Sequence, residues 1–328
     1  MSQPDTPAPF HSPTPAAGSR IIGTGHYRPA RILTNHDLEQ LVETSDEWIR
    51  QRTGIESRRI AGEDETVASM ATEAARAALA DAGIDASEIT QVLVATCSND
   101  EHSPSAAGRV AEALGLPAPA AFDVGAACSG FSHALALADQ SIRAGASTTT
   151  LVIGAEKLST YTDYTDRTTC ILTADGAGAV VLRASERPAV APVVWGTVPD
   201  LADAVTITGP GPYFAQQGRA VLGWALREAP AICHRIVEAA GVTMADIDVF
   251  VPHQANLRMI EPLAKSLGLR EDAVIADDVI TSGNTSAATI PLAISRMREA
   301  GRIRAGATAL LIGFGGGFSW AGQVVRLP

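Results

Sequence analysis

The chain carries little positive charge. Its 328 residues include 25 Lys and Arg against 36 Asp and Glu, which gives a formal net charge of −11 and a pI of about 5.1. An acidic surface repels nucleic-acid phosphates, so nucleic-acid binding is excluded as the main activity. An acidic macromolecular partner would have to dock on a local basic patch.

Cysteines and long apolar runs are also scarce. The four cysteines, Cys97, Cys128, Cys170 and Cys233, form no CxxC pair and have no paired His spacing. This argues against a metal site or a disulfide framework and favours free thiols in the cytoplasm. No apolar run reaches the ~18 residues that a membrane-spanning helix needs, so we expect no membrane association. Residues 1–20, with five prolines and no apolar stretch, are expected to be a disordered tail rather than a targeting peptide.

An internal repeat organises the rest of the chain. The stretch DAGIDASEITQVLV (81–94) resembles AAGVTMADIDVFV (239–251), and RAGASTTTLVIG (from 143) resembles RAGATALLIG (from 304), at offsets of 158 and 161 residues. Gly83 and Gly241 fit helix ends that need a positive φ. Two matches at nearly the same offset favour a duplication. Two unrelated strand–helix connections that share a common Ala-Gly ending remain the alternative.

The apolar patterns predict an α/β protein of two similar halves, residues 21–184 and 185–328, each with a sheet covered by helices. Short Val- and Ile-rich runs predict buried strands. They lie at 91–97, 120–124, 150–155, 178–184, 246–251 and 307–313. Helical spacing predicts helices at 66–82, 129–144, 218–240, 256–267 and 286–300. Pro230 and Pro291 are expected to kink or begin helical segments.

One cysteine lies among residues with almost no side-chain bulk, in DVGAACSGF (123–131). The preceding residues predict a strand and the following ones a helix, so Cys128 is expected at a helix N-terminus. Backbone N–H groups and the helix dipole favour a thiolate there, and the small neighbours leave room for a substrate. This indicates a nucleophile. A small buried core cysteine remains the alternative.

Three further stretches contain candidate catalytic or substrate-binding residues. His253, in VPHQAN, follows an apolar strand, and α/β proteins place active sites at the carboxyl ends of strands. Asn284, in TSGNTSAATIP, precedes a helix. Either residue alone is also typical of a helix cap or turn. The glycine run GFGGGF (313–318) lacks the Lys-Ser/Thr of a phosphate loop, so a close backbone approach to a substrate is the better interpretation.

Taken together and in order, these motifs resemble β-ketoacyl-acyl-carrier-protein synthase III of the thiolase superfamily. The resemblance covers about residue 21 to the end. It implies an α/β thiolase-like fold of two duplicated halves in five αβαβα layers, and a homodimer. It is carried by SDEWIRQRTGI (45–55), AACSGF, DRTTCILTADGAGAVVL, VPHQANLRM, SGNTSAATIP and GFGGGFSW.

The resemblance implies a reaction in two steps. Cys128 attacks an acyl-CoA thioester and becomes acylated, with the N–H groups of Cys128 and Gly316 as the oxyanion hole. Malonyl-acyl carrier protein then enters, and His253 and Asn284 donate hydrogen bonds to its thioester oxygen. Loss of CO2 leaves an enolate that attacks acyl-Cys128 and gives a 3-oxoacyl-carrier protein. No cofactor is implied, because acyl-CoA is a substrate.

The resemblance also assigns binding residues. CoA contacts fall on Trp48, Arg52 and Arg167, where an indole and guanidinium groups suit adenine and phosphate. Arg258 and Lys265 match a basic patch that docks the acidic carrier protein. A solvated helix face is the alternative for the latter pair.

The acyl pocket departs from the family pattern. The resemblance assigns it to Ser103, Thr173, Gln216 and Phe314, and Ser103 stands where relatives have a bulkier Phe or Thr contributed across the dimer. Arg219 and Gly223 are also unusual near the CoA and docking surfaces. We hypothesise a primer pocket that accepts branched or medium-length acyl groups, because each buried methylene contributes ~0.8 kcal/mol where space exists.

Three rival functions remain open at this level. A thiolase-fold acyltransferase would form an ester or amide without decarboxylation. An acyl-thioester hydrolase would need His253 as a base that activates water. A scaffold protein that keeps the fold without catalysis is disfavoured by the intact Cys128, His253 and Asn284.

Overall fold

The computed structural model describes residues 15–208 and 213–328. Residues 1–14 of the expected N-terminal tail lie outside the described residues. The first strand, β1 (Gly18–Tyr27), begins before residue 21, so residues 18–20 belong to the sheet rather than to the tail. Ser19 holds this start, because its N–H and its hydroxyl donate to Asp139 Oδ1 at 3.1 and 2.7 Å.

Two five-stranded mixed sheets form the frame. The first runs in the order β1, β7 (Asp175–Ser185), β6 (Thr149–Lys157), β4 (Gln91–Ala95) and β5 (Ala120–Val124). The second runs in the order β8 (Val194–Thr197), β14 (Ser319–Arg326), β13 (Thr308–Gly315), β11 (Val249–Pro252) and β12 (Val274–Ile275). In both sheets the first two pairings are antiparallel and the last two are parallel. The shared order and directions confirm the duplication.

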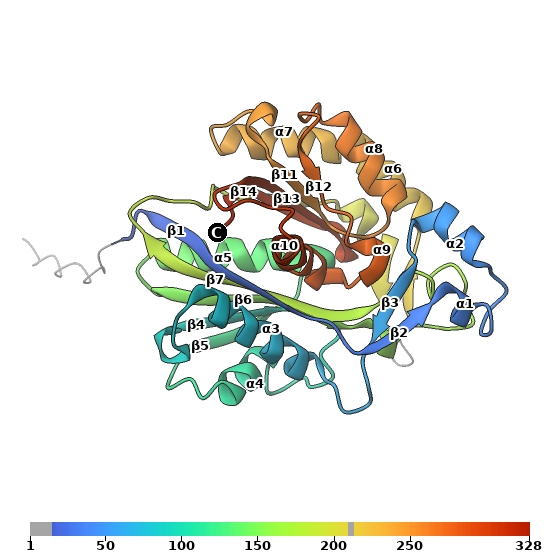
Figure 1. The fold of residues 1–328 in the computed structure, drawn as a ribbon, viewed down its shortest axis with the longest axis horizontal. Coiled ribbons are helices and arrows are strands. Elements are labelled where there is room, and N and C mark those ends of the chain that lie inside the picture. Colours follow the sequence, from blue (N-terminus) through green and yellow to red (C-terminus); the bar gives the residue numbers. More distant parts are fainter. Residues whose placement is uncertain (1–14, 209–212) are drawn as a thin grey trace, which may run out of the picture.

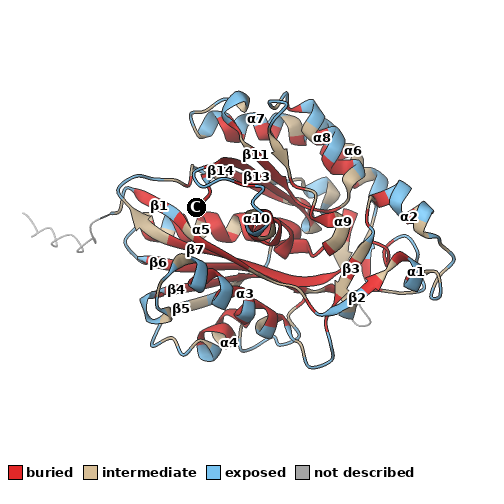
Figure 2. Cartoon of the chain, viewed as in Figure 1, coloured by how far each residue is buried: buried red, intermediate tan, exposed pale blue. Residues whose placement is uncertain are grey.

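The layers are helix, sheet, helix, sheet, helix (Figure 1). Helices α5 (Gly130–Arg143) and α10 (Thr289–Glu299) lie between the sheets, α3 (Val67–Ala82) and α4 (Ala106–Ala113) cover the first sheet, and α6 (Gly218–Arg227), α7 (Ala229–Ala239) and α8 (Leu257–Ser266) cover the second. The central layer is largely buried, whereas the outer helices expose one face (Figure 2). The five-layered fold is therefore confirmed.

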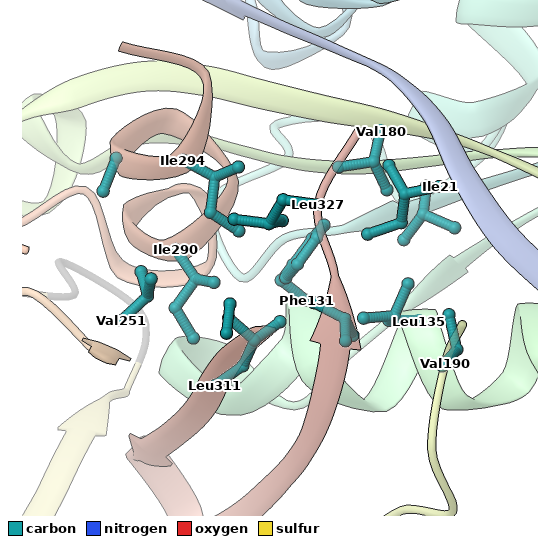
Figure 3. Close-up of a cluster of buried hydrophobic side chains, with 14 of the residues drawn as sticks. Ile21, Phe131, Leu135, Val180, Val190, Val251, Ile290, Ile294, Leu311 and Leu327 are labelled. Atoms are coloured by element: carbon teal, nitrogen blue, oxygen red, sulfur yellow. The ribbon is translucent and has the colours of Figure 1, made fainter. Parts of the chain in front are cut away.

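The central core explains why the middle helices are apolar on most sides. Phe131 and Leu135 of α5 and Ile290 and Ile294 of α10 meet between the two sheets and are at most 1% exposed (Figure 3). A helix covered on both faces must be apolar nearly all round. Truncating such a Leu to Ala costs ~2–5 kcal/mol, because a cavity remains.

Local signals set the element boundaries. Gly83 and Gly241 have φ of 65° and 70° after helices α3 and α7, as predicted. The predicted helix 218–240 is divided at Glu228, because Pro230 lies in the first turn of α7 and cannot continue a preceding helix. No helix within the described residues is long and apolar enough to cross a bilayer.

Short elements complete the described chain. They include the paired strands β2 (Arg31–Thr34) and β3 (Ser57–Ile60), the pair β9 (Val205–Ile207) and β10 (Phe214–Gln216), and the helices α1 (Asn35–Leu38), α2 (Asp46–Thr53) and α9 (Val279–Ser282). The 3₁₀ turns are η1 (Ala86–Glu88), η2 (Ala127–Ser129), η3 (Leu158–Tyr161), η4 (Pro199–Ala204), η5 (Met244–Asp246), η6 (Ser286–Ala288) and η7 (Gly316–Phe318).

Turns η2 and η6 occupy equivalent places in the two halves. Each immediately precedes the N-terminus of a central helix, η2 before α5 and η6 before α10. The two turns approach closely, since a Cβ atom at Gly130 would lie 3.6 Å from the Cβ of Ala287. The duplication therefore brings two helix N-termini to one place, where β13 also ends in η7.

Candidate active site

Cys128 lies in η2 and is 7% exposed. The glycine-rich end of β13 makes room for it, because a Cβ atom at Gly315 would lie 2.7 Å from Cys128 Sγ. A Cβ atom at Gly313 would lie 2.9 Å from the Cα of Ser129. The glycine run thus allows close backbone approach to the cysteine turn itself, and the predicted approach to a substrate stays a prediction.

The electrostatics of Cys128 differ from the expectation of a resting thiolate. Burial raises the pKa of the Cys128 thiol, because the charged form is desolvated. Hydrogen bonds from the Ser286 hydroxyl and the Gly316 N–H act against this rise in pKa. Desolvation outweighs them, so the free site holds a thiol, and its proton must leave as the sulfur is acylated.

His253 follows directly after β11, and its N–H donates to Ile312 O at 2.8 Å. The ring is 3% exposed, lies edge-on to Phe314 at 6.0 Å between centroids, and has Nδ1 2.9 Å from Thr289 Oγ1. Burial lowers the pKa of His253 to about 3, because an imidazolium would be desolvated. The ring is therefore a neutral imidazole at physiological pH.

Asn284 is fixed between α9 and η6. Its N–H donates to Leu172 O at 2.8 Å, and its C=O accepts from the Ala174 N–H at 3.0 Å. The side-chain Oδ1 accepts from the Ser286 N–H at 2.9 Å. Because that bond occupies the oxygen, the Nδ2 group is the free end of the amide. Asn284 is thus arranged as a hydrogen-bond donor.

Two cavities meet at Cys128. The entrance cavity, of about 610 Å³, contains Trp48, Arg52 and Arg258 and reaches Cys128, His253 and Asn284. The inner cavity, of about 620 Å³, contains Cys97, Leu158, Tyr161 and Ile207 and also reaches Cys128 and Asn284. Cys128 and Asn284 therefore line both cavities.

The predicted CoA residues lie close together, and two of them, Trp48 and Arg52, line the entrance cavity. The guanidinium carbons of Arg52 and Arg167 lie 5.4 and 5.3 Å from the centroid of the Trp48 ring, within cation–π range. Arg258 and Lys265 are both exposed on α8, and Arg258 lines the cavity. An aromatic ring and two cations, Trp48, Arg52 and Arg258, thus line one cavity.

The predicted acyl-pocket residues are dispersed. Gln216 and Phe314 line the entrance cavity rather than the inner one, as does Arg219. Thr173 is 1% exposed, and its hydroxyl lies 2.6 Å from that of Thr162. Ser103 is exposed and lines neither cavity of the single chain. Their assignment to the acyl pocket stays a prediction.

The sequence patterns did not indicate Glu156, a buried carboxylate next to Cys97 of the inner cavity. Glu156, at the end of β6, is fully buried and accepts from the N–H groups of Cys97 and Ala287 at 3.1 and 3.3 Å. Cys97 Sγ lies 3.3 Å from Glu156 Oε1. Burial raises the pKa of both side chains, and the neighbouring carboxylate raises that of Cys97 further. The sequence does contain one sign of this site, because the charged Glu156 directly follows the apolar run LVIGA.

Backbone strain is concentrated around Cys128. Within the described ranges, the non-glycine residues with positive φ are Ala127 (42°), Ser286 (46°) and Phe318 (43°). They lie in η2, at the start of η6 and at the end of η7. Such conformations cost of order 1–3 kcal/mol each, and they persist where the surroundings enforce them. Their concentration supports a functional site at this point.

Comparisons with known proteins identify the family. Residues 122–199 match the family model 3-oxoacyl-[acyl-carrier-protein (ACP)] synthase III, and residues 237–327 match its C-terminal model. Beta-ketoacyl-[acyl-carrier-protein] synthase III 2 of Streptomyces avermitilis is 54% identical, over 95% of this chain and 99% of that protein.

Solved structures agree as well. The priming beta-ketosynthase from the R1128 polyketide biosynthetic pathway has a TM-score of 0.95 and 38% identity, over 98% of this chain and 99% of that one. The 3-oxoacyl-[acyl-carrier-protein] synthase III of Aquifex aeolicus has a TM-score of 0.90 and 41% identity, over 94% and 100%. The chain therefore belongs to the β-ketoacyl-acyl-carrier-protein synthase III family, the thiolase-fold enzymes of the condensing, acyl-transferring kind.

Proposed function

We propose that this enzyme condenses an acyl-CoA primer with malonyl-acyl carrier protein, releases CO2, and so begins fatty acid or polyketide synthesis. One observation carries the proposal: a buried cysteine lines the same cavity as two neutral side chains that can donate, His253 and Asn284. The relative from the R1128 pathway is a priming ketosynthase by name, which supports the initiating role.

In the first step, the Cys128 sulfur attacks the thioester carbon of the primer. The C–S bond to CoA breaks, and the thiol proton ends on the departing CoA sulfur. The N–H groups of Cys128 and Gly316 would stabilise the oxyanion that forms between these events. Losing one such donor typically costs ~3 kcal/mol in the barrier.

In the second step, the malonyl thioester occupies the entrance cavity with its oxygen between His253 and Asn284. The C–C bond to the carboxylate breaks and CO2 leaves. The bonding electron pair stays on the thioester fragment as an enolate, whose oxygen accepts hydrogen bonds from the two donors. The enolate carbon then attacks acyl-Cys128, and the sulfur takes up a proton. Neutral donors suit this step, because a developing oxyanion needs hydrogen bonds more than a strong base.

The inner cavity bears on the choice of primer. Its volume of about 620 Å³ and walls such as Leu158, Ile207 and Phe214 leave apolar space beyond Cys128. Each buried methylene contributes ~0.8 kcal/mol. We therefore expect branched or medium-length primers to load at least as well as acetyl. If acetyl-CoA exceeds isobutyryl- and hexanoyl-CoA by a wide margin in kcat/KM, this part of the proposal is wrong.

Several further features belong to the proposal. No cofactor takes part, because thioester cleavage and CO2 release drive the chemistry. The enzyme works in the cytoplasm, where its free cysteines stay reduced. Arg258 and Lys265 give an acidic carrier protein a basic docking point on a chain of net charge −11.

The first sheet supports a homodimer. Strand β5 ends that sheet without a second neighbour among the described strands, and its Phe122 is 43% exposed. Such an edge favours pairing with a second copy. Sedimentation of Phe122→Asp should show monomers where the unchanged protein shows dimers, and a monomeric unchanged protein would refute the dimer.

One experiment separates this function from its rivals. The protein is mixed with a panel of acyl-CoAs and weighed intact, and malonyl-carrier protein is then added. We expect a mass gain of one acyl group that Cys128→Ala abolishes, followed by a 3-oxoacyl-carrier product. Loading without a new C–C bond would favour an ester- or amide-forming acyltransferase. Rapid CoA release without malonyl-carrier protein would favour a hydrolase, which the low basicity of His253 disfavours.

A further inference from the structure

The hydroxyl of Thr289 lies between a carbonyl oxygen and a ring nitrogen of His253 and has one proton to give. It opens α10, is 2% exposed, and its Oγ1 lies 2.9 Å from His253 Nδ1 and 2.8 Å from Ser286 O. Among the described residues, it is the hydrogen-bond partner recorded for the His253 ring. The direction of this one proton decides which ring nitrogen carries hydrogen.

Two arrangements of this proton are possible, and only the first keeps the hydroxyl bond from Thr289 to Ser286 O at 2.8 Å. If Thr289 donates to Ser286 O, its oxygen accepts from Nδ1–H, and His253 Nε2 is left with a lone pair. If Thr289 donates to Nδ1, the neutral ring carries its hydrogen on Nε2. Only the second arrangement gives His253 a donor to place beside the Nδ2 of Asn284.

The second arrangement gives up the hydroxyl bond to Ser286 O, but it does not leave that carbonyl without a donor. The carbonyl of Ser286 already accepts from the Thr289 N–H, so it does not require the hydroxyl as well. Ser286 also fixes Asn284 as a donor through its own N–H. A thioester oxygen between His253 and Asn284 would then face two donors, whereas the first arrangement would oppose it with a lone pair.

We propose that Thr289 is a positioning residue that donates its hydroxyl proton to His253 Nδ1 and thereby keeps Nε2–H available for condensation. This inference rests on the proposed function of His253 as an oxyanion donor. Thr289, the first residue of α10, would thus set the tautomer of His253, which lies 36 residues earlier in the chain.

The test combines a spectroscopic and a kinetic measurement on the full-length enzyme. Nitrogen-15 NMR of histidine-labelled protein, with His253→Gln to assign the signals, reports which ring nitrogen is protonated. Two variants are compared with the unchanged enzyme: Thr289→Val keeps the shape without the hydroxyl, and Thr289→Ser keeps the hydroxyl. Acyl loading of Cys128 and condensation with malonyl-carrier protein are timed separately.

We expect His253 to be protonated at Nε2 in the unchanged enzyme and in Thr289→Ser, and to lose this single state in Thr289→Val. Condensation by Thr289→Val should fall roughly 10- to 100-fold, as for other residues that orient a catalytic imidazole, while loading and Thr289→Ser stay near normal. An Nδ1–H ring in the unchanged enzyme, or full condensation by Thr289→Val, would overturn the inference.

The outcome is separable from a failure of the proposed function. If His253→Gln and Asn284→Ala also condense at the normal rate, the two donors have no role and the function itself is wrong. If both of those variants fail while Thr289→Val condenses normally, the function stands and only the role of Thr289 falls. Loss of acyl loading in Thr289→Val would show a general structural role and also refute the assignment.

Discussion

Gly315 and Cys128 are so close that a methyl group on the glycine would lie 2.7 Å from both the Cβ and the Sγ of the cysteine. The nucleophile can occupy its turn only because β13 ends without a side chain there. Gly315→Ala must therefore displace the sulfur or the strand. We expect acyl loading to fall roughly 100-fold, as for other displacements of about 1 Å at a reacting centre.

Gly125→Ala is the matched control, since a Cβ atom there meets nothing within 4 Å and the residue is also close to Cys128 in the chain. Loading is followed by intact mass at fixed times with one acyl-CoA. Equal loading by the two variants would contradict the steric argument.

Trp48 should matter for CoA and not for the chemistry. Replacing it with Ala removes the ring that lies near Arg52 and Arg167, so the KM for acyl-CoA should rise about tenfold, the usual effect of losing one stacked base. The KM for the same acyl group on pantetheine, which has no adenine, should not change.

The exposed Trp195, which lies on β8 and stacks on His133, gives a control substitution away from both cavities. Its replacement by Ala should leave both KM values unchanged. If Trp48→Ala raises the KM for acyl-pantetheine as much as for acyl-CoA, the indole shapes the cavity and does not hold the nucleotide.

The buried His253 should make the fold sensitive to acid. Its pKa falls from the ordinary 6.5 to about 3 in the folded protein, so between these values the unfolded chain binds the proton and the folded chain does not. The stabilising contribution of the neutral ring is complete above pH 6.5 and is lost as pH falls toward about 3.

Melting temperatures measured across this range should fall less steeply for His253→Gln than for the unchanged protein. His234→Gln, at an exposed position of α7, serves as the control and should follow the unchanged protein. Parallel curves for all three proteins would show that His253 is not what titrates.

The two thiols of the inner cavity should differ in reactivity. Cys97 stands 3.3 Å from the carboxylate of Glu156, which opposes a thiolate. Both thiols have a hydrogen bond with Ser286, but Cys128 also has one from the Gly316 N–H, which favours a thiolate. A small alkylating reagent should modify Cys128 first. In Glu156→Gln, the lost negative charge should lower the pKa of Cys97 and speed its alkylation severalfold.

Peptide mapping after timed alkylation identifies the modified thiol, and Cys97→Ala in the Glu156→Gln background shows how much of the faster reaction belongs to Cys97. Unchanged Cys97 labelling in Glu156→Gln would mean that burial alone protects this thiol.

The sequence was most informative where local rules decide the structure. Apolar runs and Ala-Gly helix endings predicted the central helices and the strands β4–β7, β11 and β13, because each depends on neighbours within about twenty residues, whereas β1, β8, β12 and β14 were missed. Cys128, His253 and Asn284 stood out because each falls at a strand end or a turn before a helix. The fold then brings them together through its duplication.

Contacts between distant segments could not be read in this way. Glu156 meets Cys97 from 59 residues away and Ala287 from 131, and nothing in a run of ten residues records such a pair. Thr173 lies in a stretch that resembles the family pattern, but its hydroxyl lies against that of Thr162. Side-chain direction in an irregular segment depends on its surroundings, so the acyl-pocket residues were the least predictable part of the site.

The arrangement of the two cavities has a kinetic consequence. Trp48 and Arg258 line the entrance cavity, and Cys128 lines both the entrance cavity and the inner cavity. CoA and the thioester-bearing group of the carrier protein would therefore occupy the entrance cavity at different times. Between the two events the acyl group stays bound to the Cys128 sulfur. Steady-state rates should then follow a ping-pong pattern, with parallel double-reciprocal lines, and free CoA should compete with malonyl-carrier protein for the vacated entrance cavity.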